Sequence, residues 1–246
     1  MLCPATDSGG AVYFTVTCAF AVGLISCGSR REVLLGGSAA VVVLVVHQIW
    51  LCHFASSLWA HSLCGTALIR GSVAMLRSPS GLLHVRASHG LLAVVLFLSI
   101  IVGEVLTTWM HFFHNYVHNA MYTLGVLLSC SAGCEDFYAC DPPHPARARR
   151  MRRQRQAVEP ALWAALGILL ASHVHDNTPI IKLSHAFLGY MFLGLAALQC
   201  LSAVASDSAA DGAVPAAVRA LNAFAWLLPG VWLLHMCFFF YLRVGG

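Results

Sequence analysis

Long apolar runs are the feature that most constrains this chain. A helix needs about 20 apolar residues to cross the hydrocarbon core of a bilayer, and runs of roughly that length recur along the whole sequence. We expect about seven transmembrane helices: residues 11–28, 34–55, 89–112, 117–133, 158–175, 179–205 and 217–242. The first run lacks a basic segment before it and a clean cleavage site after it, so we interpret it as a retained helix.

The amino-acid composition favours the same setting. Apolar residues make up 59% of the 246 residues and charged residues only 10%, and the mean hydropathy is +0.76. Soluble domains carry about 25% charged residues, and one core of this size cannot hide so much apolar surface from water. The sequence therefore predicts an all-α, polytopic membrane bundle: a single integral membrane domain, 1–246, in an endomembrane or the plasma membrane, with the lipid bilayer as partner.

Arginine is concentrated between the predicted fourth and fifth helices. The segment RARRMRRQRQ, residues 147–156, holds most of these arginines, and Arg70, Arg77 and Arg86 lie between the second and third helices. Short basic loops are retained in the cytosol, so we expect residues 141–157 to form a basic cytosolic loop that attracts anionic lipid headgroups. The loop lacks interleaved aromatic residues, so nucleic-acid binding is not indicated. Arg30 and Arg31 favour the opposite orientation but are outnumbered.

The stretch SHVHDNTPIIKLSH, residues 172–185, gathers three histidines in an otherwise apolar region. Thr178 before Pro179 is typical of a helix N-cap followed by proline at the first helical position. A tight turn at 176–177 then joins two antiparallel spans. His173 and His185 lie one or two turns from it at about 1.5 Å per residue, so we expect them to face each other at similar depth. His175 lies nearer the turn.

A second group of histidines lies between the predicted third and fourth helices, on the same non-cytosolic side. In WMHFFHNYVHNAMY, the residues His111, His114 and His118 have the i, i+3, i+7 spacing of one helix face. Asn115 stands where the HExxH motif of metalloproteases has glutamate, so peptide hydrolysis is not indicated. His235 in the last helix falls in the same outer half of the predicted bundle.

These histidines together predict a transition-metal site near the non-cytosolic face, because neutral imidazole binds zinc, copper and iron. We expect His118, His173 and His185 to converge. The full set of predicted ligands is His114, His118, His173, His175, His185 and His235. Haem stays an alternative, although a bis-histidine haem needs opposed histidines in two layers and only the outer layer is well supplied.

Two other classes of function remain open. The chain could be a non-catalytic membrane scaffold or trafficking protein whose histidines serve only as hydrogen-bonding or pH-sensitive groups. It could also be an intramembrane zinc hydrolase of lipid amides, in which three histidines leave one metal position open for water. The spacings Ser57 to His61 and Ser80 to His84 are reminiscent of ceramidase-like enzymes, but they fall on the opposite side from the main histidine group.

Glu104 is the only carboxylate near the centre of a predicted span. A charge inside the membrane is unfavourable, so such a residue usually faces the bundle interior and has a partner or a function. We expect Glu104 to meet a polar or histidine partner. The structural alternative is a protonated glutamate hydrogen-bonded to Thr107, to Thr108 or to a neighbouring helix.

Three segments carry a family resemblance: GEVLTTW with HNYVHNAMYTLGVLLSCSAGCED, then HVHDNTPIIKLSHAFLGY, then LLPGVWLLHMCFFFY. They resemble the glycine-glutamate helix, the His-x-His and proline stretch and the later tryptophan helix of the transmembrane protein 45 family, also called domain of unknown function 716. The resemblance covers about residues 89–240 and implies a seven-helix membrane protein of unsettled activity. This chain has Leu183 and Ser184 where the family usually repeats His-x-His, so one potential ligand is missing.

Overall fold

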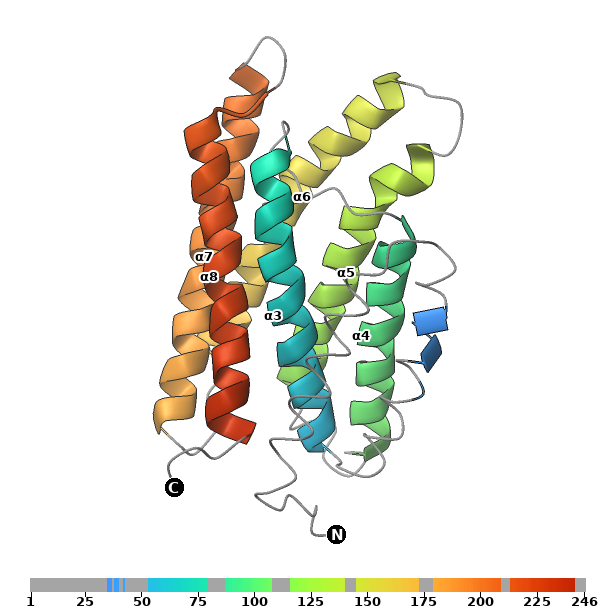
Figure 1. Cartoon of the computed structure of the whole chain (residues 1–246), viewed down its shortest axis with the longest axis vertical. Coiled ribbons are helices and arrows are strands. Elements are labelled where there is room, and N and C mark those ends of the chain that lie inside the picture. Colours follow the sequence, from blue (N-terminus) through green and yellow to red (C-terminus); the bar gives the residue numbers. More distant parts are fainter. Residues whose placement is uncertain are drawn as a thin grey trace. The chain divides into compact units, whose positions relative to one another are not determined.

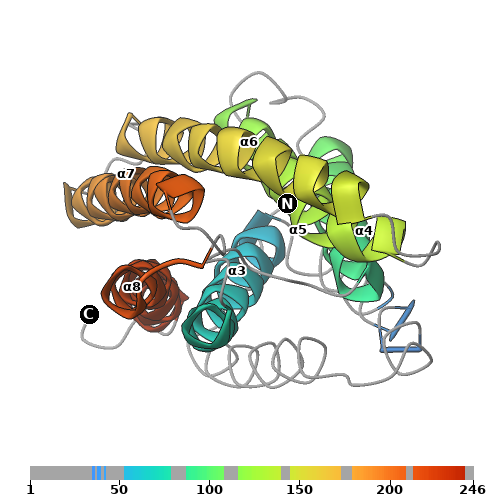
Figure 2. The same ribbon diagram turned by 90° about the horizontal axis from the view of Figure 1, so that it is seen from above.

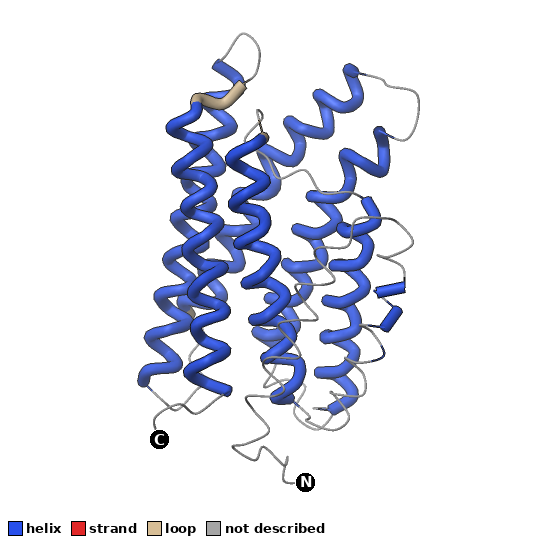
Figure 3. The backbone as a smooth tube through the Cα atoms, viewed as in Figure 1, coloured by secondary structure: helices blue, strands red, loops and turns tan. Residues whose placement is uncertain are grey.

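The computed structural model describes residues 53–78, 87–107, 116–139, 145–172, 179–208 and 213–241, together with 35, 36, 38, 39 and 42. All regular structure in this part of the chain is helical, and it contains no strand (Figure 3). The predicted all-α class is therefore confirmed. The predicted span 11–28 and most of the predicted span 34–55 lie outside the described residues.

The described residues form six long helices, labelled as in Figure 1. They are α3 (His53–Arg77), α4 (Ala87–Thr107), α5 (Tyr116–Ala139), α6 (Pro145–Ala171), α7 (Pro179–Ser208) and α8 (Ala216–Tyr241). Helices α4 to α8 overlap the last five predicted runs, with ends that differ by six residues or fewer except at the start of α6, which begins at Pro145 instead of residue 158. Helix α7 begins at Pro179, as expected from a proline at the first helical position, where its missing N–H costs nothing.

Helix α3 corrects the sequence analysis, which treated most of residues 56–88 as a connection. It is a helix of 25 residues. Serine, histidine, glycine and arginine dilute its apolar character, so no run there is apolar enough to be read as a span. The helical signal lies instead in its periodicity, because Trp59 and Leu63 are one turn apart and both are buried. Spacing, more than mean hydropathy, identifies this helix.

Most of the predicted basic loop is helical and forms the start of α6. The helix begins at Pro145, so the residues from 145 to 157 are helical and only the first few residues of the predicted loop precede it. Arginine, methionine and glutamine are good helix formers, and proline is favoured at the first helical position. The boundary of the predicted loop follows the positive charge of the segment, whereas the helix propensity of its residues makes the segment helical. The cytosolic position of this segment stays a prediction.

The chain divides into two compact units. Unit 1 comprises residues 1–67, 92–126 and 230–246, and unit 2 comprises residues 68–91 and 127–229. Helices α6 and α7 belong wholly to unit 2, whereas α3, α4, α5 and α8 each contribute residues to both units.

Helices α6 and α7 lie side by side (Figure 2). Their contact is made by small residues. A Cβ atom placed on Gly189 of α7 would lie 2.6 Å from the backbone nitrogen of Ala171 and 2.6 Å from the carbonyl oxygen of Gly167, both on α6. Glycine at this position therefore lets the two backbones approach closely, as small residues spaced four apart do between membrane helices.

An aromatic cluster joins α6, α7 and α8 within unit 2. The ring of Trp163 on α6 stacks on Phe192 of α7 at a centroid distance of 5.2 Å, and it meets Trp226 of α8 edge-on at 5.3 Å. All three side chains are buried. Such ring pairs contribute about 0.5–1.5 kcal/mol beyond their area burial. On the α3 side, a Cβ atom on Gly71 would lie 2.7 Å from the Trp226 ring, so glycine there makes room for the indole.

Two helices of the described chain are long and apolar enough to cross a membrane: Pro179–Ser208, which is α7, and Ala216–Cys237 within α8. A third segment, His89–Val102 in α4, is apolar but shorter. Length and composition alone are weak evidence for a span, because a buried core helix can satisfy the same criterion.

Candidate functional site

Three predicted metal ligands fall within the described residues. His185 is buried on α7 and belongs to unit 2, whereas His118 on α5 and His235 on α8 belong to unit 1. His114, His173 and His175 lie outside the described residues. Among the residues that are described, no group of three histidine, cysteine, aspartate or glutamate side chains could hold a metal ion. The predicted convergence of His118, His173 and His185 stays a prediction.

His185 has a defined hydrogen bond. Its Nδ1 atom lies 3.0 Å from the carbonyl oxygen of Ile181, one turn earlier in α7. A carbonyl oxygen only accepts hydrogen bonds, so Nδ1 carries the proton and donates. In a neutral imidazole, Nε2 then keeps its lone pair. Metal-binding histidines commonly have one ring N–H fixed in this way, which sets the tautomer and the ring orientation.

The other two described histidines have aromatic neighbours in their own helices. The ring of His118 stacks on Tyr122 at a centroid distance of 6.2 Å, and the ring of His235 lies 5.2 Å from Trp232. His118 is half-buried, and His235 is exposed. These contacts orient both rings by packing, and neither contact requires a metal ion.

Glu104 lies in α4, as its place in a predicted span requires. The structure describes the helix backbone at this position but not the glutamate side chain. The predicted polar or histidine partner of Glu104 therefore stays a prediction.

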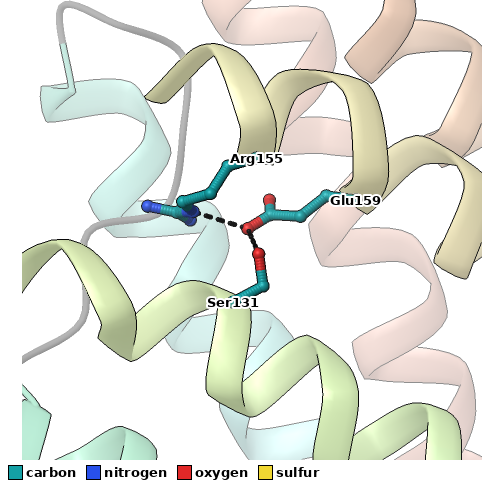
Figure 4. A network of polar contacts seen from close by, with 3 residues as sticks. All are labelled: Ser131, Arg155 and Glu159. Carbon is teal, nitrogen blue, oxygen red and sulfur yellow. Dashed lines mark hydrogen bonds and ion pairs between the residues drawn. The ribbon is translucent and has the colours of Figure 1, made fainter. Parts of the chain in front are cut away.

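The clearest polar site in unit 2 is a buried ion pair that sequence analysis missed. Arg155 and Glu159, one turn apart on α6, are only 2% and 3% exposed. The Nε atom of Arg155 donates to Oε1 of Glu159 at 2.7 Å. The hydroxyl of Ser131 on α5 donates to the same oxygen at 2.9 Å (Figure 4). One carboxylate oxygen thus links α5 to α6.

The ion pair contradicts part of the interpretation of the basic segment. Arg155 was counted with the arginines that bind lipid headgroups, but it is buried against Glu159. Arg150, Arg152 and Arg153 are exposed, as such a role requires. The signal in the sequence was the i, i+4 spacing of Arg155 and Glu159, which places opposite charges side by side on a helix.

A second polar set lies between α7 and α8 in unit 2. Asn222 of α8 donates through Nδ2 to the hydroxyl of Ser202 on α7 at 3.4 Å. Gln199 and Ser206 share the buried face of α7 with Ser202. The spacing of residues 199, 202 and 206 is i, i+3, i+7, which is one helix face. The sequence shows this spacing, but it does not show which face of α7 is buried.

Comparisons with known proteins do not add a family to these observations. No protein-family model, no curated protein and no solved structure matches this chain.

Proposed function

We propose that this chain is a multi-pass integral membrane protein of about seven helices, similar to the transmembrane protein 45 family, with a histidine-lined transition-metal site near its non-cytosolic face. Zinc, copper and iron fit the donor chemistry of imidazole. The membrane setting and the metal site rest on different observations.

The polarity of α7 supports the membrane setting. Leu183, Tyr190 and Val204 are between 64% and 71% exposed on this helix, whereas its buried face holds Leu188, Phe192 and Leu195 together with a few polar residues. A helix at the surface of a soluble protein has an apolar face inward and a polar face outward. Apolar side chains on the outer face as well as the inner one are stable in lipid.

The hydrogen bond of His185 is the observation that carries the metal site. With Nδ1 donating to the Ile181 carbonyl at 3.0 Å, Nε2 is the ring nitrogen that carries the lone pair a metal ion would need. The other proposed ligands are His114, His118, His173, His175 and His235. Three or four imidazole nitrogens at about 2.0–2.1 Å from the ion would complete a zinc site.

Metal content of the purified protein tests the site. We expect the full-length protein, purified in detergent without a metal-affinity step, to carry close to one equivalent of zinc, copper or iron. The double substitution His173→Ala with His185→Ala should remove it, whereas His61→Ala, outside the proposed set, should not. Metal retained by the double variant would refute these ligands, and a Soret band would show that the iron is in haem.

A non-catalytic membrane scaffold is the second candidate, and one observation favours it. Each described histidine of the proposed set already has a contact within its own helix: Ile181 for His185, Tyr122 for His118 and Trp232 for His235. Ring packing and a hydrogen bond of this kind stabilise a helix without any metal ion. Purified protein free of zinc, copper and iron would support the scaffold over the metal site.

The membrane setting has a separate test. We expect the protein to stay in the membrane fraction after alkaline carbonate extraction and to enter solution only with detergent. Release by carbonate alone would contradict the integral setting, whatever the metal content.

A further inference from the structure

Hydrogen-bond donors without partners gather in the buried interior of unit 2. Within the described residues, they are the side-chain nitrogens of Gln199 and Arg219 (Nε) and the indole nitrogens of Trp163 and Trp226. The side-chain oxygen of Gln199 also lacks a partner. More than 90% of buried polar groups in proteins are hydrogen-bonded, so an excess of unused donors at one place requires an explanation.

Helix geometry places these donors along one lane between α7 and α8. Ser202 and Asn222 are joined by a hydrogen bond, which sets the level at which the two antiparallel helices face each other. Gln199 lies one turn from Ser202, and Trp226 lies one turn from Asn222, so both are displaced in the same direction by about 4.5–6 Å at 1.5 Å per residue. Trp163 reaches the same level through its edge-on contact with Trp226.

Arg219 closes the other end of this lane. It lies one turn before Asn222 and two turns before Trp226, at the i, i+3, i+7 spacing of a single face. Its side chain is half-buried, and its Nε atom is fully buried. The lane therefore runs from a cation near the start of α8 to a carboxamide and two indole N–H groups in the interior.

The buried carboxamide of Gln199 is not what an ordinary packed core contains. Gln199 is 4% exposed, and both polar atoms of its carboxamide lack a partner among the described residues. Burying an amide without hydrogen bonds is unfavourable by about 1–3 kcal/mol. It shares the face of α7 that carries Ser202, the residue bonded to α8. The carboxamide thus lies on the face of α7 that meets α8 at Ser202.

We infer that this lane binds the headgroup of an acidic glycerophospholipid. The phosphodiester would accept hydrogen bonds from Arg219, and the ester carbonyl oxygens would accept them from Gln199, Trp163 and Trp226. A ligand rich in acceptors and bearing one negative charge matches a site with one cation and an excess of donors. Exposed apolar residues beside the lane, Leu201 and Leu221, suit the acyl chains.

This inference rests on the membrane setting proposed above but not on the metal site. Carbonate extraction decides the setting, so a protein that is integral yet binds no lipid here would fail this inference alone. The predicted topology agrees with it, because the start of α8 falls on the cytosolic side, where acidic lipids are concentrated.

Lipid binding to the purified, delipidated full-length protein tests the site. The probe is dihexanoyl phosphatidylglycerol, and bound lipid is counted by native mass spectrometry. We expect one lipid to bind tightly, with dihexanoyl phosphatidylcholine binding more weakly. Arg219→Gln should weaken the binding about tenfold or more through loss of a charge-assisted hydrogen bond. Gln199→Leu should weaken it about three- to tenfold.

Matched variants separate the lane from general effects. Arg150→Gln and Gln154→Leu change exposed residues of α6 and should leave the affinity unchanged. Arg219→Lys keeps the charge and should retain most of the binding that Arg219→Gln loses, which also guards against a misfolded variant. Gln199→Leu should fold normally, because replacing an unpaired buried amide by an apolar group of similar size is close to neutral.

Three results would overturn the inference. The first is lipid binding that neither Arg219→Gln nor Gln199→Leu alters. The second is binding of inorganic phosphate with the same sensitivity to the variants while phosphatidylglycerol does not bind, which would assign the lane to free phosphate. The third is no binding of either probe, which would leave water as the partner of these donors.

Discussion

Within unit 2, helix α6 contacts α5 and α7 by different means. Near its middle, Glu159 accepts hydrogen bonds from Arg155 of the same helix at 2.7 Å and from Ser131 of α5 at 2.9 Å. Near its end, Gly167 and Ala171 lie directly against Gly189 of α7. The first contact depends on charge and direction, whereas the second depends on the absence of side-chain volume.

This difference predicts what each contact tolerates. A buried ion pair can be replaced by two apolar residues of similar size at little cost, but removal of one partner leaves an uncompensated charge. A contact between two backbones has no such alternative, because even one added methyl group must displace main-chain atoms. Chemical complementarity therefore matters between α5 and α6, and shape matters between α6 and α7.

The largest effect is expected at the ion pair. Glu159→Ala should lower the free energy of unfolding by about 3–5 kcal/mol, because the buried guanidinium of Arg155 loses the carboxylate of Glu159. Unfolding of the purified protein in micelles, followed by circular dichroism, measures it. The double variant Arg155→Met with Glu159→Leu should recover most of the loss. A loss below about 1 kcal/mol in Glu159→Ala would mean that the pair behaves as a solvated surface pair.

A smaller loss is expected at the glycine contact. Gly189→Ala adds a Cβ atom where backbone atoms of Ala171 and Gly167 would lie only 2.6 Å away, and such overpacking costs about 1–3 kcal/mol. Gly194→Ala on the same helix is the matched control, because a Cβ atom there meets nothing within 4 Å. The control should be stabilised by about 0.5–1 kcal/mol. Equal effects at both positions would contradict the close approach of α6 and α7.

The smallest effect is expected at Ser131. Ser131→Ala removes one hydrogen bond to Glu159 but leaves the bond from Arg155 in place, so the free energy of unfolding should fall by about 1 kcal/mol. Ser208→Ala is the control, since the Ser208 hydroxyl is exposed and bonds only within its own helix, to the carbonyl of Val204. In the background of Glu159→Leu, the effect of Ser131→Ala should disappear. A full effect in that background would show that the serine acts through another group.

Several parts of the fold could be predicted because local chemistry decided them. The start of α7 at Pro179 follows from the missing N–H of proline, and α4 to α8 follow from long apolar runs. Helix α3 was missed because its polar and small residues lower its hydropathy, although Trp59 and Leu63 have helical spacing. The helical start of α6 was missed because positive charge was weighed above helix propensity.

The candidate sites could be predicted less well, because burial belongs to the packed molecule. The sequence placed Arg155 among surface arginines, and only the packing of α5 against α6 shows that it is buried with Glu159. The predicted histidine site gained one detail, the hydrogen bond that sets the tautomer of His185. The convergence of His185 with His118 and His173 stays a prediction, which the metal content of the substituted proteins tests.

The sequence by itself determined where the chain forms most of its helices and that its surface would be rich in apolar side chains. Both properties depend on residue type and on spacing along one helix, which a linear pattern contains. Only the tertiary structure decided that Gly189 lies against α6, that Ser202 meets Asn222 of α8 and that Gln199 is buried. These facts depend on the rotation of each helix about its axis, and contacts with residues distant in the chain set that rotation.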